Sequence, residues 1–162
     1  MGRLIVIALT LLLSACHSSS GDSVTEAGLQ QATAQAESYK VQVLNLINSY
    51  RDTKGIVRLI RTGALETQIQ DHMVDITAGR VGFGHSGMAG RCERAREELA
   101  GGNACGEIVA FAQKSPQAVF DAWIASPGHR ERISEGRYNR AGVGLAYDAD
   151  GHVYWGVLFL EK

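Results

Sequence analysis

The chain has 162 residues and an almost balanced charge, with 16 lysines and arginines against 17 aspartates and glutamates. This length suits one compact domain, and a net charge of −1 shows no excess of the basic residues that are typical of nucleic-acid binding. We therefore expect a single-domain protein whose partners are not nucleic acids.

The N-terminus has the pattern of a secretory signal. Arg3 precedes an apolar run at residues 4–13, about half the roughly 20 residues needed to cross a bilayer. The motif LSAC at residues 13–16 is similar to the bacterial lipoprotein processing site, at which the cysteine is acylated. We predict a lipoprotein signal peptide at residues 1–15, with Cys16 lipidated and anchoring the chain to a membrane. The alternative is an ordinary signal peptide that is cleaved nearby.

A flexible tether is predicted after the signal, at residues 16–37. Removal of residues 1–15 would leave 147 residues with a formal charge of −2, because Arg3 is lost. The next segment is rich in Ser, Gly, Ala, Gln and Thr, and its only large apolar residues are Val24 and Leu29. It can bury little surface, and a flexible chain of this length reaches about 25 Å. Its Ala and Gln content permits transient helix toward its end, and the folded domain is expected at residues 38–162.

Apolar residues recur at helical spacing in the first part of this domain. The predicted helices span residues 38–54, 65–78, 89–100 and 116–126. Ser38 is a candidate N-cap for the first helix, and Ser115 with Pro116 gives the fourth helix an N-cap and a first-turn residue. Pro127 and Gly128 are expected to stop that fourth helix in a turn.

Two strand-like stretches follow the helices, at residues 141–147 and 152–160. The motif DADG joins them at residues 148–151, and a turn of this kind between two apolar runs predicts a hairpin. Helices first and antiparallel strands last indicate an α+β fold rather than a parallel sheet.

With Cys16 assigned to the lipid, Cys92 and Cys105 remain. Gly101 and Gly102 allow the chain between them to fold back, and an exported protein meets an oxidising environment. We predict a disulfide, which would add about 3 kcal/mol of stability in the chain-entropy model. Two buried free thiols are the alternative, and a zinc site is disfavoured because two thiolates without a nearby histidine provide too few ligands.

Two histidines and one glutamate are the candidate site residues. His85 lies in a glycine-rich loop, Glu107 opens an apolar run, and His129 follows the end of the fourth predicted helix. Imidazole nitrogens bind zinc and related divalent ions, and a carboxylate can ligate the ion or orient a ligand. Each residue also has a simpler interpretation: surface hydrogen bonding for His85, local capping for Glu107, and a helix C-terminus for His129. His72 and His152 are interpreted as structural.

Motifs along the chain share their order and spacing with a known family. They are VLNLINSYR at residues 43–51, FGHSG at 83–87, CGEI at 105–108, SPGHR at 126–130, AGVGLAY at 141–147 and YWGVLF at 154–159. Over about residues 40–160, the chain resembles a bacterial member of the CAP superfamily, which comprises cysteine-rich secretory proteins, antigen 5 and pathogenesis-related 1 proteins.

The resemblance implies an α-β-α sandwich with a small antiparallel sheet between helices and a central cleft. His85, Glu107 and His129 match cleft positions of the family, in which the histidines would hold zinc or another divalent metal. Two departures weaken an inherited catalytic role. Ser126 stands near the place of a second glutamate of many eukaryotic members, and Ile108 replaces the asparagine of the usual bacterial Gly-Glu-Asn motif.

The function expected from these observations is a secreted, membrane-anchored CAP module of the bacterial cell envelope, on the periplasmic face or the cell surface. Its cleft would bind a small-molecule, lipid or protein ligand. The alternative is a metal-dependent hydrolase in which Glu107 acts as general base toward a metal-activated water. The motifs contain no convincing nucleophile, which favours binding over catalysis. A structural envelope protein with an unused cleft is a third hypothesis.

Overall fold

A computed structural model describes residues 25–162. The predicted signal peptide, Cys16 and the first part of the predicted tether lie outside the described residues. No helix in the described part of the chain is both long enough and apolar enough to cross a membrane.

A four-stranded sheet in the order β1-β3-β4-β2 forms the middle of the domain. The predicted hairpin is confirmed as β3 (Arg140–Tyr147) and β4 (Val153–Leu160), which pair antiparallel. The apolar run around Glu107 is a further strand, β2 (Cys105–Phe111), antiparallel to β4. The short β1 (Ile60–Arg61) pairs parallel with β3, so the sheet is mixed and not purely antiparallel as predicted. Two residues are too few to show a strand pattern in a sequence.

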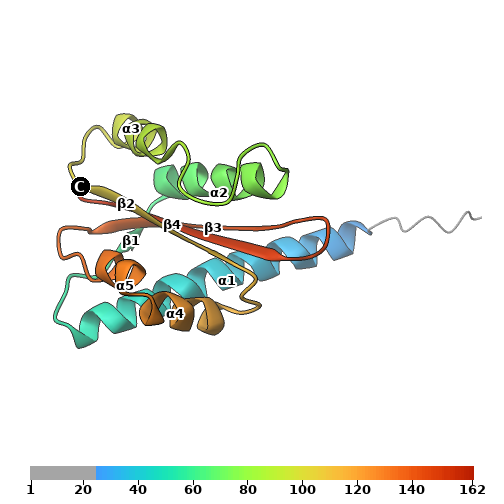
Figure 1. Cartoon of the computed structure of the whole chain (residues 1–162), viewed down its shortest axis with the longest axis horizontal. Helices are drawn as coiled ribbons and strands as arrows, with labels where there is room; N and C mark the ends of the chain where they lie inside the picture. Colours follow the sequence, from blue (N-terminus) through green and yellow to red (C-terminus); the bar gives the residue numbers. More distant parts are fainter. Residues whose placement is uncertain (1–24) are drawn as a thin grey trace, which may run out of the picture.

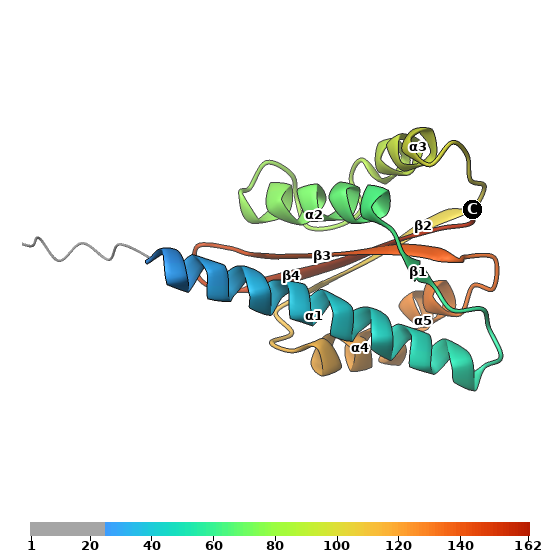
Figure 2. The ribbon, with the colours of Figure 1, turned by 180° about the vertical axis from the view of Figure 1, so that it is seen from behind.

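Helices cover both faces of this sheet, which confirms the predicted α+β sandwich (Figure 1). One face carries α2 (Gly63–Thr77) and α3 (Met88–Glu98). The opposite face carries α1 (Glu26–Thr53), α4 (Pro116–Ala125) and α5 (Pro127–Ile133). Figure 2 shows the same layers from behind, with α1 running along the sheet.

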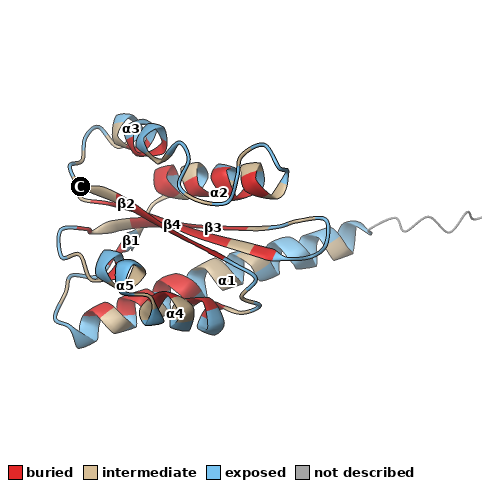
Figure 3. Cartoon of the chain, viewed as in Figure 1, coloured by how far each residue is buried: buried red, intermediate tan, exposed pale blue. Residues whose placement is uncertain are grey.

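The helix α1 begins at Glu26, twelve residues before the predicted start at Ser38. The side-chain oxygen of Thr25 accepts a hydrogen bond from the Gly28 N–H at 3.2 Å and caps the helix. The prediction of a flexible segment is therefore wrong for residues 26–37. Alanine, glutamine and glutamate favour helix, and extending a helix that is already packed requires no new nucleation. None of these early residues is buried, as the exposed start of α1 in Figure 3 shows.

Ser115 caps α4 as predicted, because its hydroxyl oxygen accepts a hydrogen bond from the Ala118 N–H at 3.2 Å. The turn predicted at Pro127-Gly128 is wrong, since Pro127 is the first residue of α5. Proline fits the first turn of a helix, where its missing N–H is not needed. The chain thus bends at Ser126, and His129 lies in a helix rather than in a turn.

The sheet separates two apolar clusters. The larger one contains the fully buried Trp123 and Trp155 and packs the sheet against α1, α4 and α5. The smaller one packs α2 and α3 against the other face. There α2 approaches β3 so closely that a Cβ at Gly142 would lie 2.1 Å from the backbone nitrogen of Glu66. Glycine at this position lets helix and sheet pack in direct contact.

Candidate functional site

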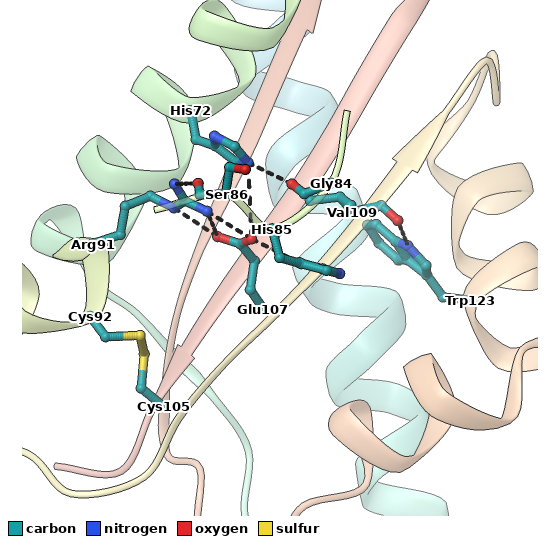
Figure 4. Close-up of polar contacts among 10 residues, drawn as sticks. All are labelled: His72, Gly84, His85, Ser86, Arg91, Cys92, Cys105, Glu107, Val109 and Trp123. Carbon is teal, nitrogen blue, oxygen red and sulfur yellow. Dashed lines mark hydrogen bonds and ion pairs between the residues drawn. A yellow bond between two sulfur atoms is a disulfide. The ribbon is translucent and has the colours of Figure 1, made fainter. Parts of the chain in front are cut away.

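Glu107 is the centre of a buried polar cluster between β2 and the helices α2 and α3. Its side chain is fully buried, and it points toward Arg91 of α3 and toward His85 of the preceding loop (Figure 4). A carboxylate in such a place requires charge compensation and hydrogen bonds, because burial of an isolated charge is costly.

Arg91 supplies this compensation. Its Nε donates to Oε2 of Glu107 at 2.8 Å, and its Nη2 donates to Oε1 at 2.9 Å. The third donor, Nη1, binds the backbone oxygen of Ser86 at 2.7 Å. The bidentate ion pair neutralises the carboxylate, and the bond to Ser86 fixes the loop that carries His85.

His85 receives its orientation from Glu107. The ring nitrogen Nδ1 lies 2.9 Å from Oε1 of the carboxylate. Because an ionised carboxylate only accepts hydrogen bonds, Nδ1 is the donor, which leaves Nε2 as the ring nitrogen that Glu107 does not engage. The His85 side chain is 49% exposed, in contrast to the buried groups that hold it. The arrangement resembles the carboxylate–histidine pairs that position metal ligands in proteins.

His72 belongs to the same cluster, although the sequence interpretation left it out of the site. Its buried ring lies on α2, and its Nε2 is 2.8 Å from the backbone oxygen of Gly84. The same nitrogen is 4.0 Å from Oε1 of Glu107, too far for a hydrogen bond. His72 therefore holds the loop just before His85. The sequence feature that could have indicated this role is the position of His72 within the apolar face of a predicted helix.

A disulfide fastens the two elements that carry the ion pair. Cys92 and Cys105 are bonded, as predicted, with their Cα atoms 6.1 Å apart. Cys92 follows Arg91 directly on α3, and Cys105 lies two residues before Glu107 on β2 (Figure 4). The bond therefore limits how far Arg91 and Glu107 can separate.

His129, the third predicted site residue, lies on α5 and is half-buried. Burial lowers the pKa of His129 below its ordinary range, and a charge on nearby His85 lowers it further. The ring is therefore neutral at neutral pH, the form that binds metals. Since the folded chain takes up this proton less readily than the unfolded chain, His129 reduces stability as the pH falls below about 6.5.

A cavity of about 230 Å³ opens beside the polar cluster. Its lining consists of His85, Met88, Gly106, Glu107 and Arg132. The structure thus brings two of the three predicted site residues into one cavity, with His129 outside its lining but within electrostatic reach of His85. Another cavity, of about 270 Å³, lies between α1 and α4 and is lined by no titratable side chain.

The hydrogen bonds of Glu107 leave the two histidines, His85 in the cavity and His129 outside its lining, as better candidate metal ligands than all three predicted residues together. Both oxygens of Glu107 are engaged by Arg91, and one also binds His85. The atoms left to hold an ion are Nε2 of His85 and a ring nitrogen of His129. Glu107 orients His85 in this arrangement, as outer carboxylates do at many metal sites.

In the described part of the chain, one group of three potential ligands lies within 4.8 Å: Asp148, Asp150 and His152. These residues form the connection between β3 and β4. Oδ1 of Asp148 accepts from the backbone N–H groups of Asp150 and His152, at 3.0 and 2.9 Å. The Asp148 carboxylate is thus occupied in closing the hairpin, which agrees with the structural interpretation of His152.

Comparison with known proteins identifies the family. The model of the cysteine-rich secretory protein family, CAP, matches residues 44–159. No protein of curated function matches the chain.

Solved bacterial structures share the fold. An extracellular protein of Bacillus anthracis that contains an SCP domain is 20% identical, with a TM-score of 0.70 over 88% of this chain and 45% of the other. A cysteine-rich secretory protein of Staphylococcus aureus is 19% identical, with a TM-score of 0.65 over 79% of this chain and 40% of the other. An outer surface protein of Borrelia burgdorferi is 21% identical, with a TM-score of 0.62 over 74% and 90%. The chain thus spans less than half the length of the first two relatives.

Proposed function

Because this chain belongs to the CAP family of cysteine-rich secretory proteins, we propose that it is a binding module of the bacterial cell envelope whose cleft takes a ligand beside His85. The observation that carries the proposal is the fixed ring of His85. Glu107 holds Nδ1 at 2.9 Å, and the half-exposed ring lines the cavity. A divalent metal on His85 and His129 would act as a Lewis acid toward a ligand bound there.

Binding is favoured over the alternative, metal-dependent hydrolysis, by the state of Glu107. A general base must reach the attacking water and accept its proton. The Glu107 carboxylate is buried, and both of its oxygens already accept hydrogen bonds from Arg91, so neither is free to take a proton from a water molecule. Glu107 is therefore suited to orient His85 and poorly suited to act as a base.

The envelope location rests on the sequence and on the relatives. The apolar N-terminus and the motif LSAC at residues 13–16 support export and lipidation at Cys16. The bacterial relatives include an extracellular protein and an outer surface protein. The disulfide between Cys92 and Cys105 also suits an oxidising compartment.

Replacement of the lipidated residue, Cys16→Ala, is expected to move nearly all of the protein from the membrane fraction to the soluble fraction, because the acyl chains would be lost. Fractionation with immunoblotting and labelling by a radioactive fatty acid measure this. Ser18→Ala, close to the same motif, serves as the control and should leave the protein in the membrane. Membrane retention of the Cys16→Ala chain would overturn lipid anchoring at this residue.

Zinc binding tests the metal at the cleft. Calorimetric titration of the metal-free chain should give one zinc ion per molecule, with binding lost in the His85→Ala/His129→Ala variant. Glu107→Gln should weaken binding about 10–100-fold without abolishing it, since the carboxylate acts through His85. The control is His152→Ala, which removes an exposed histidine of the β3–β4 connection and should bind as the wild type does.

Circular dichroism of each variant verifies that the loss does not result from unfolding. A folded wild-type chain that binds no zinc would contradict the metal and leave a metal-free binding cleft. Binding that survives the double histidine replacement would place the ion elsewhere.

A further inference from the structure

The cavity beside His85 contains a cation that the fold leaves without a partner. Arg132 of α5 lines this cavity. Within residues 25–162, its guanidinium takes part in no hydrogen bond or ion pair. The stem of the side chain packs over β2, because a Cβ at Gly106 would lie 3.4 Å from Cδ of Arg132. The stem thus passes close to Gly106, and because Arg132 is exposed, the donors at the end of its side chain are available to a ligand.

The other charged groups of the cavity do not balance Arg132. The charge of Glu107 is cancelled by Arg91, which binds both of its oxygens. Glu135 lies just past the end of α5 and outside the cavity lining; its carboxylate feels the charge of Arg132 but is hydrogen-bonded to Arg137, at 3.1 and 2.9 Å. Among the described side chains that line the cavity, Arg132 is therefore the cation without a paired carboxylate.

We propose that Arg132 determines the specificity of the cleft by binding an oxyanion group, a phosphate or a carboxylate, of the ligand. A guanidinium presents paired N–H donors that match two oxygens of such a group. The volume of about 230 Å³ admits the charged end of a ligand with a few carbon atoms. This inference rests on the proposed function, because it specifies the ligand class of the same cleft.

The test follows the His85 ring by proton–carbon NMR while inorganic phosphate is added to the full chain at pH 7.5. A chelator removes metals, and sodium chloride keeps the ionic strength constant. The expected result is a saturable shift of the His85 signal. In Arg132→Gln the phosphate affinity should fall about tenfold or more, since a charge-assisted hydrogen bond is lost. The matched control is Arg94→Gln, the same change at an exposed arginine of α3 that lies outside the cavity lining.

Two further probes distinguish the sources of the oxyanion. Acetate tests a carboxylate, and short-chain phosphatidylglycerol below its micelle concentration tests a lipid headgroup. Whichever probe binds most tightly should lose affinity in Arg132→Gln and keep it in Arg94→Gln. An unchanged affinity in Arg132→Gln, or no saturable shift with any probe in the folded wild type, would overturn the proposal. Since metals are absent, this outcome leaves the zinc result of the proposed function untouched.

Discussion

Replacing Arg91 by methionine is expected to destabilise the folded chain by about 3–5 kcal/mol at neutral pH. The substitution leaves the fully buried carboxylate of Glu107 without its ion partner and frees the backbone oxygen of Ser86. Removing one member of a buried pair costs more than the pair itself contributes, because the remaining charge stays desolvated. Urea unfolding measured by circular dichroism gives the difference.

The double variant Arg91→Met/Glu107→Gln tests whether the loss of stability comes from the unpaired charge of Glu107 or from lost packing of the Arg91 side chain. Since the uncompensated charge is gone, the double variant should be more stable than Arg91→Met alone. Arg80→Met serves as the control, because Arg80 and Asp75 form an exposed pair, for which a loss of at most about 1 kcal/mol is expected. A loss in Arg91→Met no larger than in Arg80→Met would contradict the buried pair.

Arg51→Met is expected to cost about 4 kcal/mol or more, since each buried carbonyl left without a donor costs about 1–3 kcal/mol. The fully buried Arg51 side chain donates to four backbone oxygens, those of Val57, Ile133, Glu135 and Tyr138, at 2.8, 2.7, 3.1 and 2.7 Å. Burial lowers the pKa of Arg51, yet a guanidinium keeps its proton throughout the accessible pH range. One side chain of α1 thus holds the end of α5 and the chain that leads into β3.

The stability of this variant follows from the same urea titration, and Arg51→Lys covers the case in which Arg51→Met does not fold. A lysine keeps the charge but has no planar fork to reach all four oxygens, so an intermediate loss is expected. The control is Arg58→Met, which removes a largely exposed arginine paired with Asp52. If Arg51→Met were as stable as Arg58→Met, the backbone oxygens that Arg51 binds would have to receive hydrogen bonds from other donors. Because Arg51 anchors the end of α5, Arg51→Lys should also shift the NMR signals of His129.

The sequence predicted correctly those helices and strands whose positions are determined by residues close to one another in the chain. Ser115 and Pro116 mark the start of α4 because capping and first-turn preferences act within four residues. The β3–β4 hairpin follows from two apolar runs joined by a short polar turn. The parallel pairing of β1 with β3 joins residues about 80 positions apart, and no local pattern carries that information.

Some residues of the candidate site could likewise be identified from the sequence, and others only from the packed structure. His85 and Glu107 could be identified from their motifs, which the family resemblance linked to one cleft. Arg91 and His72 could not, because a charged residue on a polar helix and a histidine on an apolar one have many possible partners. Their roles appear only when α2 and α3 pack beside β2. The local structure predicted for His129 was wrong, because the residue lies in a helix and not in a turn, and its part in the site stays a prediction.

The early start of α1 has a mechanical consequence. Residues 26–37 rise about 18 Å along the helix axis, at roughly 1.5 Å per residue. A helix is a stiff rod, whereas a coil of the same length samples many directions. For a domain held at its N-terminus, the rod would therefore add a spacing of about 18 Å between residue 26 and the rest of α1, which a coil of the same length would not keep constant.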